Sequence, residues 1–205
     1  MKATIKNEEY LDETQSLKVI REMIQVSRNK LKNDGILFIV WGWIFFINYL
    51  FLNYLPGKIL LSHQLMEIIR SLRVILPVFG LIFTIYYILK QRKKAQTYIG
   101  ISLRYVWISL FASMVLVNLI QMNVLHSINF ELQHPIFMVL IAFAVTVTGG
   151  ILRYRLIIAG GLIFGLLALA ASYFELQTQL LLDAIAWFVA FVIPGHLLYA
   201  KRDKK

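Results

Sequence analysis

Long apolar runs, separated by short polar segments, dominate the chain from residue 36 onward. A helix needs around 20 mostly apolar residues to cross a hydrocarbon core of about 30 Å, and roughly 17 to 25 are tolerated. Six stretches of the chain fit this requirement, although the second is short. The sequence therefore predicts six membrane-spanning helices: Ile36 to Tyr54, Val74 to Leu89, Tyr105 to Gln121, Ile136 to Leu152, Leu156 to Tyr173 and Leu180 to Tyr199.

Only Arg153, Tyr154 and Arg155 separate the fourth predicted span from the fifth. Without the two arginines, these spans would merge into one apolar run that is too long for a single crossing. The three residues therefore predict a tight turn at the aqueous surface.

Positive residues are divided very unevenly between the two faces that six crossings create. Of the 21 Lys and Arg residues, only Lys58, Arg70 and Arg73 fall on the face opposite the termini. Positive residues in short loops are retained in the cytoplasm. We therefore expect both termini and the Arg153 to Arg155 turn to be cytoplasmic, and the connection from His126 to Pro135 to be external.

The polar segment before the first span contains a helical pattern from Ser16 to Lys32. Apolar residues fill one face, and a stripe of positive residues follows the neighbouring face: Lys18, Arg21, Arg28 and Lys32. This pattern predicts an amphipathic helix that lies along the inner membrane surface or docks on a protein partner.

The composition agrees with a membrane protein. Hydrophobic residues make up 59% of the chain and charged residues 16%, against roughly 45 to 50% and about 25% in soluble domains. The net charge of +10 fits a membrane surface with anionic lipid better than nucleic acid. The absence of cysteine excludes disulfides, thiolate catalysis and Cys-ligated metals.

The expected architecture is all-α, an integral membrane six-helix bundle made of three antiparallel hairpins. Residues 1–35 form the cytoplasmic amphipathic segment, residues 36–199 the bundle and residues 200–205 a basic tail. Gly161 and Gly165 form a GxxxG motif on the fifth span, and small residues of this kind let helices approach closely in lipid. The motif predicts packing against the fourth span, with homo-oligomerisation through the same face as the alternative.

Asp183 is the one acidic residue within the predicted spans, and an intramembrane carboxylate is by default a candidate functional residue. At a similar depth, near the external end, lie the amides of Asn48, Asn118 and Gln121, with Trp187 one turn further along from Asp183. Together these residues could line an outward-facing polar pocket for a small solute. The alternative is that they are hydrated helix ends or hydrogen bonds between helices.

Motifs of known enzyme classes are absent: the sequence contains no HExxH, GxSxG, P-loop or GxGxxG pattern. His126, Glu131 and His134 would suit a metal only if their loop folded back on itself. We therefore expect a protein that is not an enzyme and has no cofactor or metal.

The segment SLKVIREMIQVSRNKLKNDGILFIVWGWIFF, Ser16 to Phe46, resembles the opening of small uncharacterised six-span bacterial inner-membrane proteins. The resemblance covers mainly the N-terminal quarter of the chain. It implies the bacterial cytoplasmic membrane and a docking helix joined to a bundle, and it brings no activity or site residues.

Two functional hypotheses follow. The first is an interaction or regulatory subunit that meets a protein partner at the cytoplasmic face. The second is a small-solute-binding or transport-related protein with its pocket around Asp183. The first is preferred at this point, because coupled transporters usually have several ionisable residues or interrupted helices within the membrane.

Overall fold

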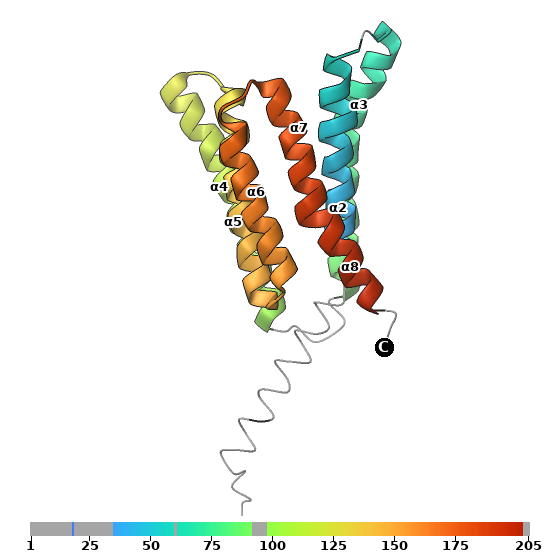
Figure 1. Cartoon of the computed structure of the whole chain (residues 1–205), viewed down its shortest axis with the longest axis vertical. Coiled ribbons are helices and arrows are strands. Elements are labelled where there is room, and N and C mark those ends of the chain that lie inside the picture. Colours follow the sequence, from blue (N-terminus) through green and yellow to red (C-terminus); the bar gives the residue numbers. More distant parts are fainter. Residues whose placement is uncertain (1–17, 19–34, 60, 92–97, 203–205) are drawn as a thin grey trace, which may run out of the picture.

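The computed structural model describes residues 18, 35–59, 61–91 and 98–202 (Figure 1). Within these residues every regular element is a helix and no strand occurs, so the predicted all-α membrane fold is confirmed. The predicted amphipathic helix falls outside the described residues except for Lys18, which is exposed.

Six helical rods make up the described chain, and two of them change helix type along their length. The first rod runs through α2 (Ile36–Ile47), the π-helix η1 (Asn48–Tyr54) and the 3-10 helix η2 (Leu55–Gly57). The last rod runs through α7 (Leu176–Trp187), the π-helix η3 (Phe188–Val192) and α8 (Ile193–Arg202). Between them lie α3 (His63–Gln91), α4 (Tyr98–Leu125), α5 (Phe130–Leu152) and α6 (Arg155–Ala171).

Five of the rods are long and apolar enough to cross a membrane. The sixth, α6, is apolar but has only 17 residues, which is the lower end of what a crossing tolerates.

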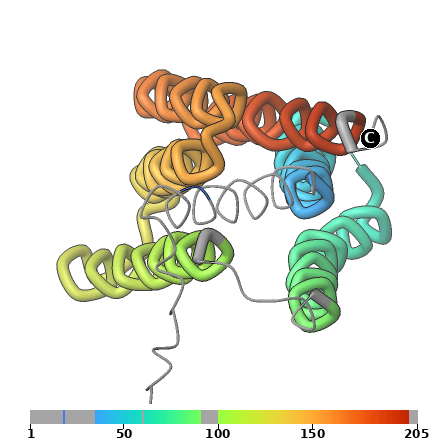
Figure 2. Tube along the Cα trace, turned by 90° about the horizontal axis from the view of Figure 1, so that it is seen from below, coloured from blue at the N-terminus to red at the C-terminus, as the bar shows by residue number. Residues whose placement is uncertain are grey.

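Each of the three expected hairpins is present as a contacting pair: α2 with α3, α4 with α5, and α6 with α7. The most extensive interface joins α5 to α6. Viewed end-on, α3 and α4 lie apart from each other on the side away from α6 and α7 (Figure 2). The helices α3, α4 and α5 and the last rod each contain an apolar stretch of 18 residues that could cross a membrane. Of this stretch, 50% is buried in α5 and in the last rod, whereas 6% is buried in α3 and in α4. The protein core therefore lies among α2, α5, α6 and the last rod.

A two-residue connection joins α5 to α6 at the predicted position. Arg153 adopts a left-handed conformation with φ of 50°, and its N–H donates to the carbonyl of Gly150. The N–H of Tyr154 reaches back to the carbonyl of Gly149 at 2.9 Å. These paired bonds are those of a Schellman motif. The triplet Arg153 to Arg155 therefore does form the tight turn that separates the two helices.

Glycines on α6 allow it to pack closely on its neighbours. A Cβ at Gly161 would meet the backbone N of Thr146 on α5 at 2.8 Å, and one at Gly160 would meet Cα of Ala190 on η3 at 2.9 Å. Gly165 is less constrained, because its Cβ would lie 3.6 Å from Cβ of Ala142. The Gly161 side of the GxxxG motif is thus occupied by α5 of the same chain.

Four helices begin at least four residues earlier than the sequence patterns predicted: α3, α4, α5 and α7. α3 starts at His63 and is continuous with the predicted second span; Ser62 accepts from the N–H groups of Leu65 and Met66 at this start. α5 starts at Phe130, because the side chain of Asn129 caps it by accepting from the N–H of Leu132. The corrections at α3 and α5 follow from capping side chains that satisfy the first free N–H groups of a helix.

Candidate functional site

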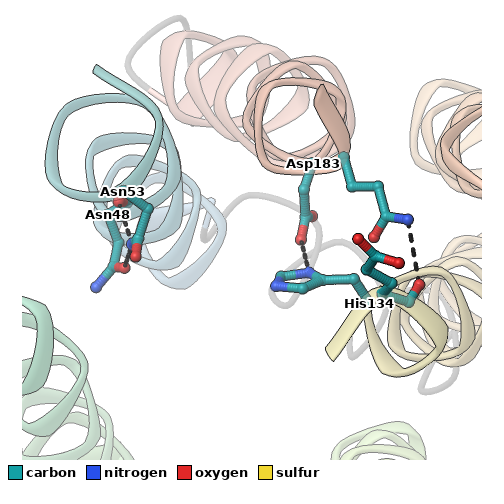
Figure 3. Close-up of polar contacts among 6 residues, drawn as sticks. Asn48, Asn53, His134 and Asp183 are labelled. Carbon is teal, nitrogen blue, oxygen red and sulfur yellow. Dashed lines mark hydrogen bonds and ion pairs between the residues drawn. The ribbon is translucent and has the colours of Figure 1, made fainter. Parts of the chain in front are cut away.

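A buried pair of a carboxyl and an imidazole group, which is an ion pair when the imidazole is protonated, joins α7 to α5 at the centre of the site. Asp183 of α7 is 2% exposed, and its Oδ2 lies 3.4 Å from Nδ1 of His134 on α5 (Figure 3). The side chain of His134 retains 19% exposure. Because α5 begins at Phe130, His134 belongs to this helix and not to the external connection in which the sequence analysis placed it.

Aromatic side chains surround the pair. The ring of Tyr49 on η1 contacts the His134 ring edge-on at a centroid distance of 5.6 Å. Tyr49 and Trp187 both lie close enough to interact with the Asp183 carboxylate. Trp187 stacks on Phe45 of α2 with ring centroids 4.2 Å apart. The carboxylate therefore lies between His134 of α5 and aromatic side chains of the first and last rods.

Three polar side chains follow one face of α7 at intervals of four residues: Gln179, Asp183 and Trp187. Each is at most 3% exposed, and each has one polar atom without a hydrogen-bond partner among the described residues. These atoms are two acceptors, Gln179 Oε1 and Asp183 Oδ1, and one donor, Trp187 Nε1. Buried polar groups are almost always hydrogen-bonded, so three such atoms on one stripe are an unusual feature of α7.

Gln179 also anchors α7 to α5 one turn from the ion pair. Proline has no N–H, so Pro135 cannot donate to the carbonyl of Glu131 four residues earlier in α5. The Gln179 side chain donates to that carbonyl at 3.1 Å and to the carbonyl of Phe174 at 2.9 Å. The Gln179 side chain thus supplies the donor that Pro135 cannot give to the Glu131 carbonyl.

Asn48 lies in a separate cluster that faces α3. Its side chain donates to the carbonyl of Arg73 at 2.9 Å and accepts from Asn53 at 2.8 Å (Figure 3). Arg73 in turn donates from Nε to the carbonyl of Leu52 at 2.6 Å, and Gln177 of α7 donates to that of Tyr54. These bonds use up carbonyls of η1 and tie it to α3 and α7.

Asn118 and Gln121 form a third cluster at the α4 and α5 interface. Gln133 donates to Asn118 Oδ1 at 2.5 Å, and Gln121 Oε1 accepts from the N–H of Asn129 at 2.9 Å. Of the five predicted pocket residues, the structure brings Asp183 and Trp187 onto one face of one helix. The other three make hydrogen bonds elsewhere and have none with Asp183.

The remaining predicted residues have no place in this site. Arg21, Arg28 and Lys32 lie outside the described residues, and so do any contacts of the basic stripe they share with Lys18. His126 is exposed in the connection after α4, away from the ion pair. No group of three or more metal-ligating His, Asp or Glu side chains occurs in the part of the chain that the structure describes.

Sequence reasoning missed His134, Tyr49 and Gln179 as parts of the site. The sequence analysis places His134 in the connection from His126 to Pro135, because it begins the fourth span at Ile136. The capping signal that corrects this assignment is Asn129, followed in the first turn by Glu131. Moving the helix start to Phe130 brings His134 to the same end of the bundle as Asp183.

Comparisons with known proteins add nothing to this geometry. A scan against protein-family models, a search of curated proteins and a search of solved structures found no match to this chain.

Proposed function

We propose that this protein is a non-enzymatic integral membrane protein that binds a small polar solute at Asp183, in a transport-related role. The observation that carries the proposal is the buried, unpartnered Oδ1 of Asp183, flanked on the same face of α7 by the unpartnered atoms of Gln179 and Trp187. A carboxylate inside a membrane span is costly unless it is compensated. His134 compensates one oxygen of Asp183, and the other oxygen has no partner within hydrogen-bonding distance.

The helices that carry the site support a binding role. Both η1, which holds Tyr49, and η3, which follows Trp187, are π-helical. Short π-helical segments within α-helices occur frequently at functional sites.

The proposal includes a topology. The chain crosses a bacterial cytoplasmic membrane six times, with α6 as the short fifth span and with both termini cytoplasmic. The excess of Lys and Arg on the terminal face supports this orientation. Since Asp183 lies in the second turn of α7, the solute site is then closer to the external surface.

A thermal-shift screen of small solutes on the purified protein in detergent tests the binding role. We expect at least one solute to raise the Tm of the wild type and to have no such effect on Asp183→Asn, which keeps the size of the side chain but removes its charge. A solute at 100 times its Kd stabilises the folded state by about 2.7 kcal/mol. Glu175→Gln is the matched control, because Glu175 is an exposed acid at the start of the same rod. If no solute gives an Asp183-dependent shift, the proposed function is wrong.

A second function, as an interaction subunit, is favoured by the periphery of the bundle. In α3 and in α4, only 6% of the apolar stretch that could cross a membrane is buried within the chain. Large apolar side chains on these helices are more than half exposed, among them Phe79, Ile82, Phe111 and Leu116. Lipid or a partner's helices would cover such surfaces equally well. Purification in mild detergent tests this function: a stoichiometric membrane partner, lost on polar substitution at Phe79 and Phe111, would support it.

A further inference from the structure

The charge of the Asp183 site limits the kind of solute that it accepts. One buried negative side chain, Asp183, and one side chain that can become positive, His134, face each other across the α7 and α5 interface. The other carboxylate of α5, Glu131, is exposed in the first turn of the helix. Tyr49 on η1 is the other titratable group that interacts with Asp183. Of the remaining elements packed against α7, α2 and η3 contain no titratable residue, and α6 contains only Arg155, exposed at its first position. An anion would therefore find no positive partner other than His134.

The free hydrogen-bonding atoms point to a donor-bearing ligand. Asp183 Oδ1 and Gln179 Oε1 are acceptors one helical turn apart. A positively charged group with several N–H donors satisfies both. A metal ion fits less well, because Asp183 and His134 supply two ligands where a catalytic zinc site uses three protein side chains.

We propose, on the basis of the solute-binding function above, that the ligand is a small primary ammonium ion that enters in exchange for one proton. In the empty site, Asp183 and His134 share a proton, so the pair is neutral overall. When R–NH₃⁺ binds Asp183, His134 gives up its proton and the site again has no net charge. Exchange avoids the cost of an unpaired charge within the membrane.

The exchange has two measurable consequences. One proton is released for each ammonium ion bound. Binding also tightens by about tenfold for each unit of rising pH, over the range in which the empty site holds its proton, because proton and cation affinities are reciprocally linked. The proton has a route out, since the His134 side chain is 19% exposed while that of Asp183 is 3% exposed.

Titration calorimetry of the purified protein with ethylammonium, in two buffers of different ionisation enthalpy, counts the protons released. For the wild type we expect one proton to be released per ethylammonium bound. Tetramethylammonium, which has no N–H donor, should bind more weakly than ethylammonium by roughly tenfold or more. For Asp183→Asn we expect binding to be lost.

Each other outcome overturns the exchange. Binding to the wild type without proton release would contradict it. No ethylammonium binding by the wild type would also overturn it, whether or not Asp183→Asn folds. In that case the thermal-shift screen separates the two proposals: an Asp183-dependent shift with a neutral solute leaves the proposed function standing, and no shift at all removes both.

Discussion

Pro135 and Gln179 show how single residues position the site. The proline leaves the Glu131 carbonyl of α5 without its helical donor, and the Gln179 amide from α7 takes the place of that donor at 3.1 Å. The bond lies one turn from Asp183, so it fixes α7 against α5 where the ion pair forms. A helix-breaking residue in one element thus creates the anchor for another.

Gln179→Ala should lower the free energy of unfolding by about 1 to 3 kcal/mol, because it leaves a buried carbonyl unpaired. The cost should be smaller in a Pro135→Ala background, where the N–H of Ala can donate to Glu131. Gln179 also donates to the Phe174 carbonyl, and that contribution is the same in both backgrounds. A double-mutant cycle in mixed micelles measures the difference; equal costs in the two backgrounds would show that the Glu131 bond does not stabilise the fold.

At the scale of elements, close packing through glycine decides how α6 fits between its neighbours. Adjacent glycines at 160 and 161 face η3 and α5 respectively, where any Cβ would clash with backbone atoms. Gly165, four residues further on, has room for a methyl group. The two positions of the GxxxG motif therefore differ in their tolerance of substitution.

Gly161→Ala should destabilise the protein by about 1 to 3 kcal/mol through overpacking. Gly165→Ala should be neutral or stabilise it by up to about 1 kcal/mol, because alanine favours a helix over glycine. Unfolding free energies of the two variants in the same detergent check this contrast. Equal destabilisation would mean that α6 does not pack on α5 through Gly161.

The sequence predicted the helical elements better than their ends and their partners. Apolar runs gave all six rods, and Arg153 and Arg155 located the α5 to α6 turn. The starts of α3 and α5 were wrong because local caps at Ser62 and Asn129 extend each helix into polar sequence. The partner of Asp183 was missed for the same reason, since His134 lies in the extension.

At the scale of the whole molecule, the separation of α3 from α4 could not be predicted. Lipid tails are as apolar as leucine, so a helix face that meets lipid has the same residue pattern as one that meets another helix. Only the three-dimensional structure distinguishes a face that meets lipid from one that meets a helix. The buried share of the apolar stretch is 6% for α3 and for α4, against 50% for α5.

Single-cysteine labelling tests the proposed topology, and the chain has no native cysteine to interfere. Ser127 and Arg155 are both exposed, in the connection before α5 and at the start of α6. In intact cells, an impermeant maleimide should label Ser127→Cys and leave Arg155→Cys unlabelled until the cells are permeabilised. Labelling of Arg155→Cys without permeabilisation would reverse the orientation or change the number of crossings.

The central claim is that the Asp183 and His134 pair serves binding and is not required for the fold. Removing one partner alone, as in Asp183→Leu, should destabilise the protein by about 3 to 5 kcal/mol, because the other polar group is left without its partner. Replacing both with apolar residues of similar volume is often neutral or stabilising by about 1 to 4 kcal/mol.

The most direct measurement is therefore the free energy of unfolding of the double variant Asp183→Leu, His134→Leu, compared with that of the wild type in the same detergent without solute. We predict that the double variant is at least as stable as the wild type, which would mean that the pair is not there for stability. A double variant that is less stable by about 3 kcal/mol or more would contradict the claim and would identify the pair as a structural tie between α5 and α7.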